Sequence, residues 1–234
     1  MLSLENNLWA SLKKCLILAF KRNSLIMLLA LLVLSAFIYF SIYVIIIIKL
    51  FNPALLKSFV DFIYTNYPSD HPKPCTQEFF LYIFTNNTGF YWNPQKLLVW
   101  IPIFGTLIIG LTFLINGVII GSVAAITGLE YGPLLPIAGL IPHGIIEIPA
   151  FIFQWTAIIR WHITISMLLF NKIRGEKVEK TKIKSELIDV FILSAISIFL
   201  LFIAALIETY ITPLLIELVD KNGGSYLGGS NSFL

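Results

Sequence analysis

The sequence is dominated by long apolar blocks that contain almost no charged residues. Residues 24–50, 97–127 and 187–218 form three such blocks. Each exceeds the roughly 18 apolar residues that a helix needs to cross a hydrocarbon core about 30 Å thick. Soluble domains carry about 25% charged residues, whereas this chain carries 12%. The sequence therefore predicts an all-α, multi-span transmembrane bundle that is embedded in the lipid bilayer.

Charges and prolines divide the rest of the chain. Residues 1–22 place apolar and basic side chains at helical spacing, which predicts an amphipathic interfacial helix before a first span over 23–50. Residues 51–96 contain five prolines and several acidic side chains, so we expect an extramembrane segment. Residues 97–218 form the predicted transmembrane core. The Gly/Ser-rich residues 219–234 are expected to form a flexible tail.

The apolar stretch 134–170 decides the predicted topology. It is too long for one crossing and barely long enough for two, and Pro142 predicts a broken or re-entrant helix within it. Basic residues gather in 1–22 and in the loop 171–186, and the positive-inside rule places both on the cytoplasmic side. We therefore expect about five spans in the cell membrane, with the N-terminus cytoplasmic and the C-terminus outside.

Few polar side chains lie inside the apolar blocks, and each needs an explanation. A charged group at the centre of a membrane helix costs on the order of 2.5–3.5 kcal/mol on insertion scales, so such groups usually face a bundle interior or a cavity. Arg160 and His162 lie near a predicted interface, where snorkelling accounts for them. The remaining candidates are Asn116, His143, Glu147 and Glu208.

His143 and Glu147 form the first candidate site. Their separation of four residues places both side chains on one helix face. Pro142 and Gly144 flank the histidine, and a helix that begins at Pro142 would leave free backbone N–H groups beside it. The pair can bind an ion or take part in catalysis, or the two groups can simply satisfy each other and fix the packing of the helix. Both interpretations stay open.

Glu208 is the second candidate, because Ala204 and Ala205 permit close helix approach beside it. It can carry a proton or a cation, or it can donate a hydrogen bond to a neighbouring helix in its neutral form. Together with His143 and Glu147 it would complete a divalent-metal site of three ligands. The zinc-protease signature H-E-x-x-H is absent, and we expect no other cofactor.

Gly117 and Gly121 form a G-x-x-x-G motif in the block 97–127, with Asn116 beside it. Such motifs let two membrane helices approach closely, and an asparagine side chain can hydrogen-bond across the contact. The motif therefore indicates close helix packing and does not by itself indicate a function. The sequence leaves open whether the two helices belong to one chain or to two copies.

Four motifs together resemble the stage II sporulation protein M family. They are Asn86-Asn87 before a long apolar block, Asn116-Gly117-x-x-x-Gly121, the string IPHGIIEIPA at 141–150 and the late AALIE at 204–208. The resemblance covers roughly residues 79–215, and P-H-G-x-x-E is its most specific element. It implies an all-helical, multi-span protein without a known cofactor. The probable functional core that it implies consists of Asn87, Asn116, His143, Gly144, Glu147 and Glu208.

The same resemblance implies a non-enzymatic function. Sporulation members of the family act as membrane scaffolds for peptidoglycan-degrading partners during engulfment, which implies a scaffold or envelope-remodelling component that forms homo-oligomers and meets envelope-associated proteins. Two alternatives stay open. One is a small transporter or channel whose hydrated path is lined by the His/Glu cluster, and the other is a metal-dependent intramembrane hydrolase. The small net charge of +3 and its place at membrane flanks indicate no nucleic-acid partner.

Overall fold

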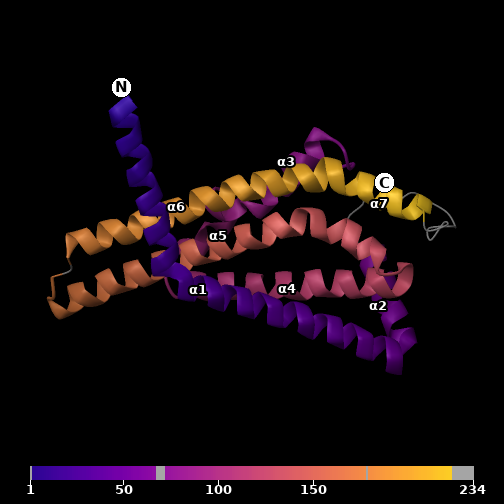
Figure 1. Cartoon of the computed structure of the whole chain (residues 1–234). Coiled ribbons are helices and arrows are strands. Elements are labelled where there is room, and N and C mark those ends of the chain that lie inside the picture. The colour runs from indigo at the N-terminus through magenta and orange to yellow at the C-terminus, as the bar shows by residue number, and fades with distance from the viewer. Residues whose placement is uncertain (1, 67–71, 178, 223–234) are drawn as a thin grey trace. The chain divides into compact units, whose positions relative to one another are not determined.

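A computed structural model describes residues 2–66, 72–177 and 179–222, and it contains only helices and connecting turns in these ranges (Figure 1). The all-α class that the apolar blocks predict is therefore confirmed. The helices are α1 (Leu2–Phe51), α2 (Pro53–Asn66), α3 (Gln77–Asn87), α4 (Phe104–Tyr131), α5 (Leu134–Arg174), α6 (Lys180–Leu206) and α7 (Thr212–Asn222), with 3₁₀ turns η1 (Gly89–Tyr91) and η2 (Pro94–Trp100) and a π-helical turn η3 (Ile207–Ile211).

Within the part of the chain that the structure describes, four helical runs are long and apolar enough to cross a membrane. They are Lys13–Phe51 of α1, all of α4, all of α5, and Lys180–Asp220, which runs through α6 and η3 into α7. This number is roughly consistent with the prediction of about five spans. At 1.5 Å per residue, the 41 residues of α5 extend over about 60 Å, roughly twice the hydrocarbon thickness.

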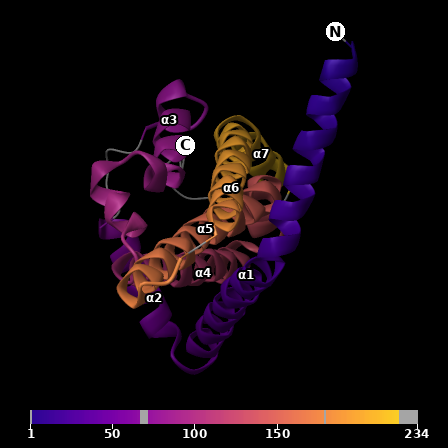
Figure 2. The same cartoon turned by 90° about the vertical axis from the view of Figure 1, so that its left-hand side faces the viewer.

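The predicted break or re-entrant turn near Pro142 is wrong, because α5 runs without interruption from Leu134 to Arg174. The ribbon of α5 can be followed without interruption in Figure 1, and Figure 2 shows the same helices turned by 90°. A proline removes one helical N–H group and crowds a carbonyl one turn earlier. Membrane helices tolerate this when neighbouring helices and side chains satisfy the freed groups. Pro142 is therefore accommodated inside α5 and does not begin a helix.

The N-terminal helix is also continuous. The interfacial helix predicted for 1–22 and the span predicted for 23–50 form the single helix α1, whose described residues begin at Leu2. The sequence contains neither glycine nor proline before Pro53, so nothing in it ends the helix earlier.

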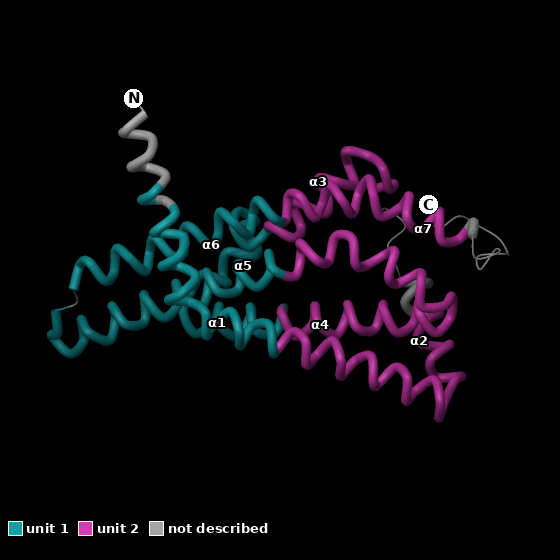
Figure 3. The backbone as a smooth tube through the Cα atoms, viewed as in Figure 1, with its two compact units in different colours: residues 1–32, 89–112, 149–200 teal, residues 33–88, 113–148, 201–234 magenta. Residues whose placement is uncertain are grey.

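Contacts along the chain divide the molecule into two compact units (Figure 3). Unit 1 comprises residues 1–32, 89–112 and 149–200, and unit 2 comprises residues 33–88, 113–148 and 201–234. The boundaries fall inside α1, α4, α5 and α6 and between α3 and η1. Each unit is described by itself below.

Unit 1 packs the 3₁₀ turn η2 against the C-terminal part of α5. Trp161 Nε1 donates to the carbonyl of Trp100 at 2.8 Å, and Trp100 Nε1 donates to the carbonyl of Phe90 at 2.6 Å. The two indoles therefore satisfy carbonyl groups that the short 3₁₀ turns leave unpaired. Val99 is fully buried in the apolar cluster beside them. This packing fixes residues 89–100, a segment without a long helix.

Unit 2 packs α4 closely against α1. A Cβ atom at Gly117 would lie 2.9 Å from the Cβ of Phe37, and one at Gly121 would overlap Ser41 Oγ and the carbonyl of Ile38. Only glycine permits this approach of the two helices. The G-x-x-x-G contact thus lies within one chain. Asn116 is half-buried on the same helix, and its side chain makes no hydrogen bond to another residue in the described part of the chain.

Candidate functional site

Helix α5 supplies two polar side chains to the interior of unit 2. His143 and Glu147 lie one turn apart, with His143 Nε2 3.9 Å from Glu147 Oε2. Their side chains are 10% and 16% exposed, so both groups are largely removed from solvent and lipid. This arrangement follows directly from the four-residue spacing on a continuous helix.

The third side chain comes from the π-helical turn η3, which carries Glu208 between α6 and α7. Pro213 follows and has no N–H group, so the carbonyl of Thr209 loses its helical partner four residues later. The backbone N–H of Cys75 donates to that carbonyl instead, at 3.2 Å. Single π-turns are frequent at functional sites because they redirect the side chains that they carry. Here the turn carries Glu208 to the α5 pair.

The three groups converge on one point. One ligand atom each from His143, Glu147 and Glu208 lies within 4.8 Å of the other two. A metal ion with bonds of about 2.0–2.2 Å requires donors no more than about 4.4 Å apart. Small side-chain rotations therefore bring all three atoms into one coordination shell.

Two further side chains hold the ligands in place. Asn87 Nδ2 lies 2.6 Å from Glu147 Oε1 and donates a hydrogen bond to it. His143 Nδ1 lies 3.3 Å from the hydroxyl of Thr212, which leaves Nε2 on the side of the two carboxylates. Groups that fix the orientation of a histidine or carboxylate in this way are typical of metal sites.

The donor set of the three residues is one that a divalent cation accepts. Two carboxylates that face each other in a buried site repel when both are ionised, and a cation or shared protons must offset that repulsion. One imidazole nitrogen and carboxylate oxygens are ligands that zinc and manganese accept. Three protein ligands also leave at least one coordination position free for another group.

The predicted site residues divide into two groups. His143, Glu147 and Glu208 are brought together by the structure, and Asn87 contacts them through Glu147. Gly144 has open space where a Cβ atom would lie, so it makes no close helix contact there. The other predicted residues lie elsewhere: Asn116, Gly117 and Gly121 on α4, and Pro142 on the wall of an apolar pocket.

A second polar network, in unit 1, was not predicted. Asp189 is fully buried and accepts hydrogen bonds from Nε and Nη2 of Arg22 and from Asn23 Nδ2. Arg160 Nε in turn donates to Asn23 Oδ1 at 2.6 Å. Asp189 lies near the charged end of an apolar block, where a solvated flank is the ordinary interpretation. Glu186 and Asp189 are three residues apart, so both lie on one face of a helix. This spacing was the sequence signal for a polar cluster at this position.

His162 also differs from its predicted role. Snorkelling at an interface was expected, yet its side chain is buried, with Nε2 2.7 Å from the carbonyl of Val99 and Nδ1 2.8 Å from the hydroxyl of Thr106. The ring therefore bridges η2, α4 and α5. Both ring nitrogens of His162 contact hydrogen-bonding partners, so neither is free to bind a metal ion.

Comparisons of the sequence with known proteins gave a family match and a partial match to an archaeal protein. Residues 30–213 match the family described as stage II sporulation protein M. An uncharacterized protein of Methanocaldococcus jannaschii is 36% identical over 124 residues, a match that spans 49% of this chain and 65% of the archaeal protein. The chain therefore covers slightly less than two thirds of that relative. No solved structure was found that matches the chain.

Proposed function

The chain belongs to the stage II sporulation protein M family, and on that basis we propose that it is a non-enzymatic membrane scaffold organised around one divalent metal ion. His143, Glu147 and Glu208 would hold the ion. The observation that carries the proposal is the convergence of one imidazole and two carboxylates within 4.8 Å. A metal ion would tie α5 to the irregular turn η3, and so stabilise two otherwise separate chain segments.

The proposal includes an orientation in the cell membrane. Arg22 on α1 and the basic residues at the start of α6 belong to the same unit, and Arg22 Nη2 lies 3.5 Å from the carbonyl of Ser185 on α6. This proximity supports one common side for the N-terminal basic residues and the loop. By the positive-inside rule that side is cytoplasmic. Crossings by α1, α4, α5 and the α6–α7 run alone would place the loop 171–186 opposite residues 1–22. The proposed orientation therefore requires that the chain between α1 and α4 also crosses the membrane, and the C-terminus would then lie outside.

A scaffold role also requires partners. Many large apolar side chains of α1, α4 and α6 are exposed in the isolated chain, including Leu25, Leu107 and Phe199. Lipid covers such surfaces in a monomer, and further helices cover them in an assembly. We propose that the protein forms homo-oligomers and meets envelope-associated proteins. Covalent cross-linking in native membranes tests this part.

Metal removal tests the central part of the proposal. Dialysis of the detergent-solubilised protein against EDTA is expected to lower its thermal unfolding midpoint, and one equivalent of Zn²⁺ is expected to restore it. A ligand at 100 times its dissociation constant stabilises the folded state by about 2.7 kcal/mol. The midpoint can be followed by intrinsic tryptophan fluorescence, since the chain contains five tryptophans.

Two variants make this measurement specific. His143→Ala should unfold at the same midpoint with and without Zn²⁺. Glu78→Gln alters an exposed carboxylate of α3 and should keep the full zinc response. An identical zinc response in the wild type and in His143→Ala would show that the ion stabilises some other site, and would overturn the proposal.

A further inference from the structure

An open groove runs along one face of α6 in unit 1, at the end where α6 follows the turn from α5 (Figure 1). Its volume is about 430 Å³. The lysines that line it lie at the start of α6, and apolar side chains follow toward the middle of the apolar run. The groove therefore has a charged end and an apolar end. The lining residues recur at helical spacing and are Lys180, Ile183, Lys184, Leu187, Ile188 and Phe191.

The groove has the length and the polarity of one leaflet of a bilayer. Lys180 and Phe191 are 11 residues apart, which is about 16 Å along a helix, and half of a hydrocarbon core about 30 Å thick is about 15 Å. Lysine side chains lay their methylene stems along apolar surface and keep the ammonium group at the level of the head groups. Phe191 is 75% exposed at the other end, so the apolar part of the groove is open to hydrocarbon chains.

The charge of the two lysines is not compensated within the described part of the chain. The side chains of Lys180 and Lys184 are exposed, and neither forms an ion pair with a described residue. Glu186 lies on the same helix but is buried and accepts a hydrogen bond from Thr164 at 2.9 Å. Asp189 is also buried and is paired with Arg22. The two ammonium groups are therefore available to an anion outside the chain.

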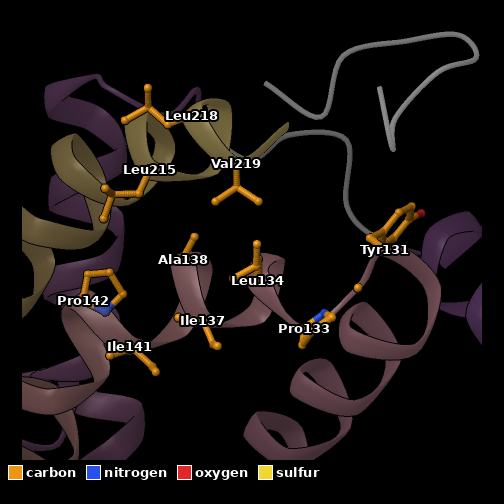
Figure 4. A pocket seen from close by; sticks show the side chains of 11 residues that line it. Tyr131, Pro133, Leu134, Ile137, Ala138, Ile141, Pro142, Leu215, Leu218 and Val219 are labelled. Carbon is orange, nitrogen blue, oxygen red and sulfur yellow. The ribbon is translucent and has the colours of Figure 1, made fainter. Parts of the chain in front are cut away.

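A pocket in unit 2 shows what the lysines add. Ala138 and Pro142 line one side of that pocket, and Leu215 and Val219 face them (Figure 4). None of its described lining residues is charged. Lipid tails already surround a membrane protein, so apolar walls alone give no preference for one lipid over another. In the groove on α6 the two lysines can supply that preference.

We propose that the groove on α6 binds one anionic phospholipid, with its head group at Lys180 and Lys184 and a hydrocarbon chain along Leu187, Ile188 and Phe191. Residues four positions apart on a helix have Cβ atoms about 6 Å apart, so two ammonium groups can flank one phosphate. Anionic lipids are enriched in the cytoplasmic leaflet, and the proposed orientation places the start of α6 on that side. The inference does not depend on the metal ion of the proposed function.

Photoaffinity labelling of the full chain tests the inference. The protein is reconstituted in phosphatidylcholine vesicles that contain a trace of phosphatidylglycerol or of phosphatidylcholine, each with the same diazirine-bearing acyl chain. Two juxtamembrane lysines favour an anionic lipid on the order of 10-fold, so phosphatidylglycerol should label residues 183–191 about 10-fold more strongly. Both lipids should label residues 107–111 equally, because Leu107 and Leu111 are exposed on α4, which contains neither lysine nor arginine.

Double variants with equal loss of charge separate the groove from general surface charge. Lys180→Gln with Lys184→Gln should make the two lipids label residues 183–191 equally. Lys172→Gln with Lys182→Gln removes two exposed lysines that do not line the groove, and should leave the preference unchanged. Lys180→Arg with Lys184→Arg keeps both charges and should keep the preference. All four side chains are exposed, so these changes should affect folding little.

Equal labelling of residues 183–191 by the two lipids in the wild type would overturn the inference. The same loss of preference in both glutamine double variants would also overturn it, because the preference would then come from diffuse surface charge. Cross-links between two chains at 183–191 in place of lipid adducts would identify a second copy as the occupant. The zinc response of the unfolding midpoint should be unchanged in every variant, since the groove contains no residue of the proposed metal site. The two proposals can therefore fail separately.

Discussion

Glu208→Gln is expected to weaken Zn²⁺ binding by at least about 100-fold. Loss of a group that only orients a ligand typically costs 10–100-fold in metal affinity, and Glu208 is itself one of three ligands within 4.8 Å. The amide keeps the size of the side chain but removes its negative charge. Competition with a chromophoric chelator in detergent solution measures the dissociation constant directly.

Asn87→Ala provides a graded comparison for the same titration. Asn87 donates to Glu147 at 2.6 Å and does not contact the proposed metal position itself, so its loss should cost about 10-fold to 100-fold. Glu78→Gln, on the same helix as Asn87, should leave the affinity unchanged. If Glu208→Gln binds zinc as tightly as the wild type, Glu208 is not a ligand and its place beside the α5 pair has another cause.

Asp189→Ala is expected to lower the free energy of unfolding by about 3 kcal/mol. Removing one partner of a buried ion pair costs about 3–5 kcal/mol because the other charge loses its compensation. The Asp189 side chain is fully buried, but that of Arg22 is 37% exposed and can turn partly to water, so the lower end of the range applies. Chemical denaturation in micelles measures the change.

Two variants check that the loss comes from the ion pair. Replacing both partners together, as Arg22→Met with Asp189→Leu, should recover much of the stability, because apolar pairs often replace buried ion pairs without loss. Glu176→Ala removes an exposed carboxylate between α5 and α6 and should change stability by less than about 0.5 kcal/mol. A wild-type unfolding midpoint in Asp189→Ala would show that the hydrogen-bonded network does not stabilise unit 1.

The helical membrane fold could be predicted from the sequence because the apolar blocks admit few alternatives. The position of the π-helical turn η3 could not be predicted from the sequence. Pro142 and Pro213 are both prolines within apolar stretches, yet α5 continues through the first and the π-turn η3 precedes the second. At the second proline a partner from elsewhere in the chain takes part, since the N–H of Cys75 satisfies the carbonyl that Pro213 leaves free. Sequence spacing carries no information about such a partner.

Only part of the candidate site could be predicted, because its other members are brought in by chain segments far away in the sequence. The His143–Glu147 pair follows from helix periodicity, and the cost of a carboxylate at membrane depth singled out Glu208. The hydrogen bond from Asn87 joins residues 60 positions apart and depends on how α3 packs. Asp189 was missed because an acidic residue at the end of an apolar block usually faces water, whereas here Arg22 and Asn23 bury it.

X-ray absorption at the zinc edge of the zinc-loaded protein tests the central claim most directly. The account predicts one imidazole nitrogen at about 2.0–2.1 Å and carboxylate oxygens at about 2.0–2.2 Å, with the imidazole signal lost in His143→Ala. A sulfur shell at about 2.3 Å, two or more imidazoles, or an unchanged spectrum in His143→Ala would contradict a metal ion bound by His143, Glu147 and Glu208.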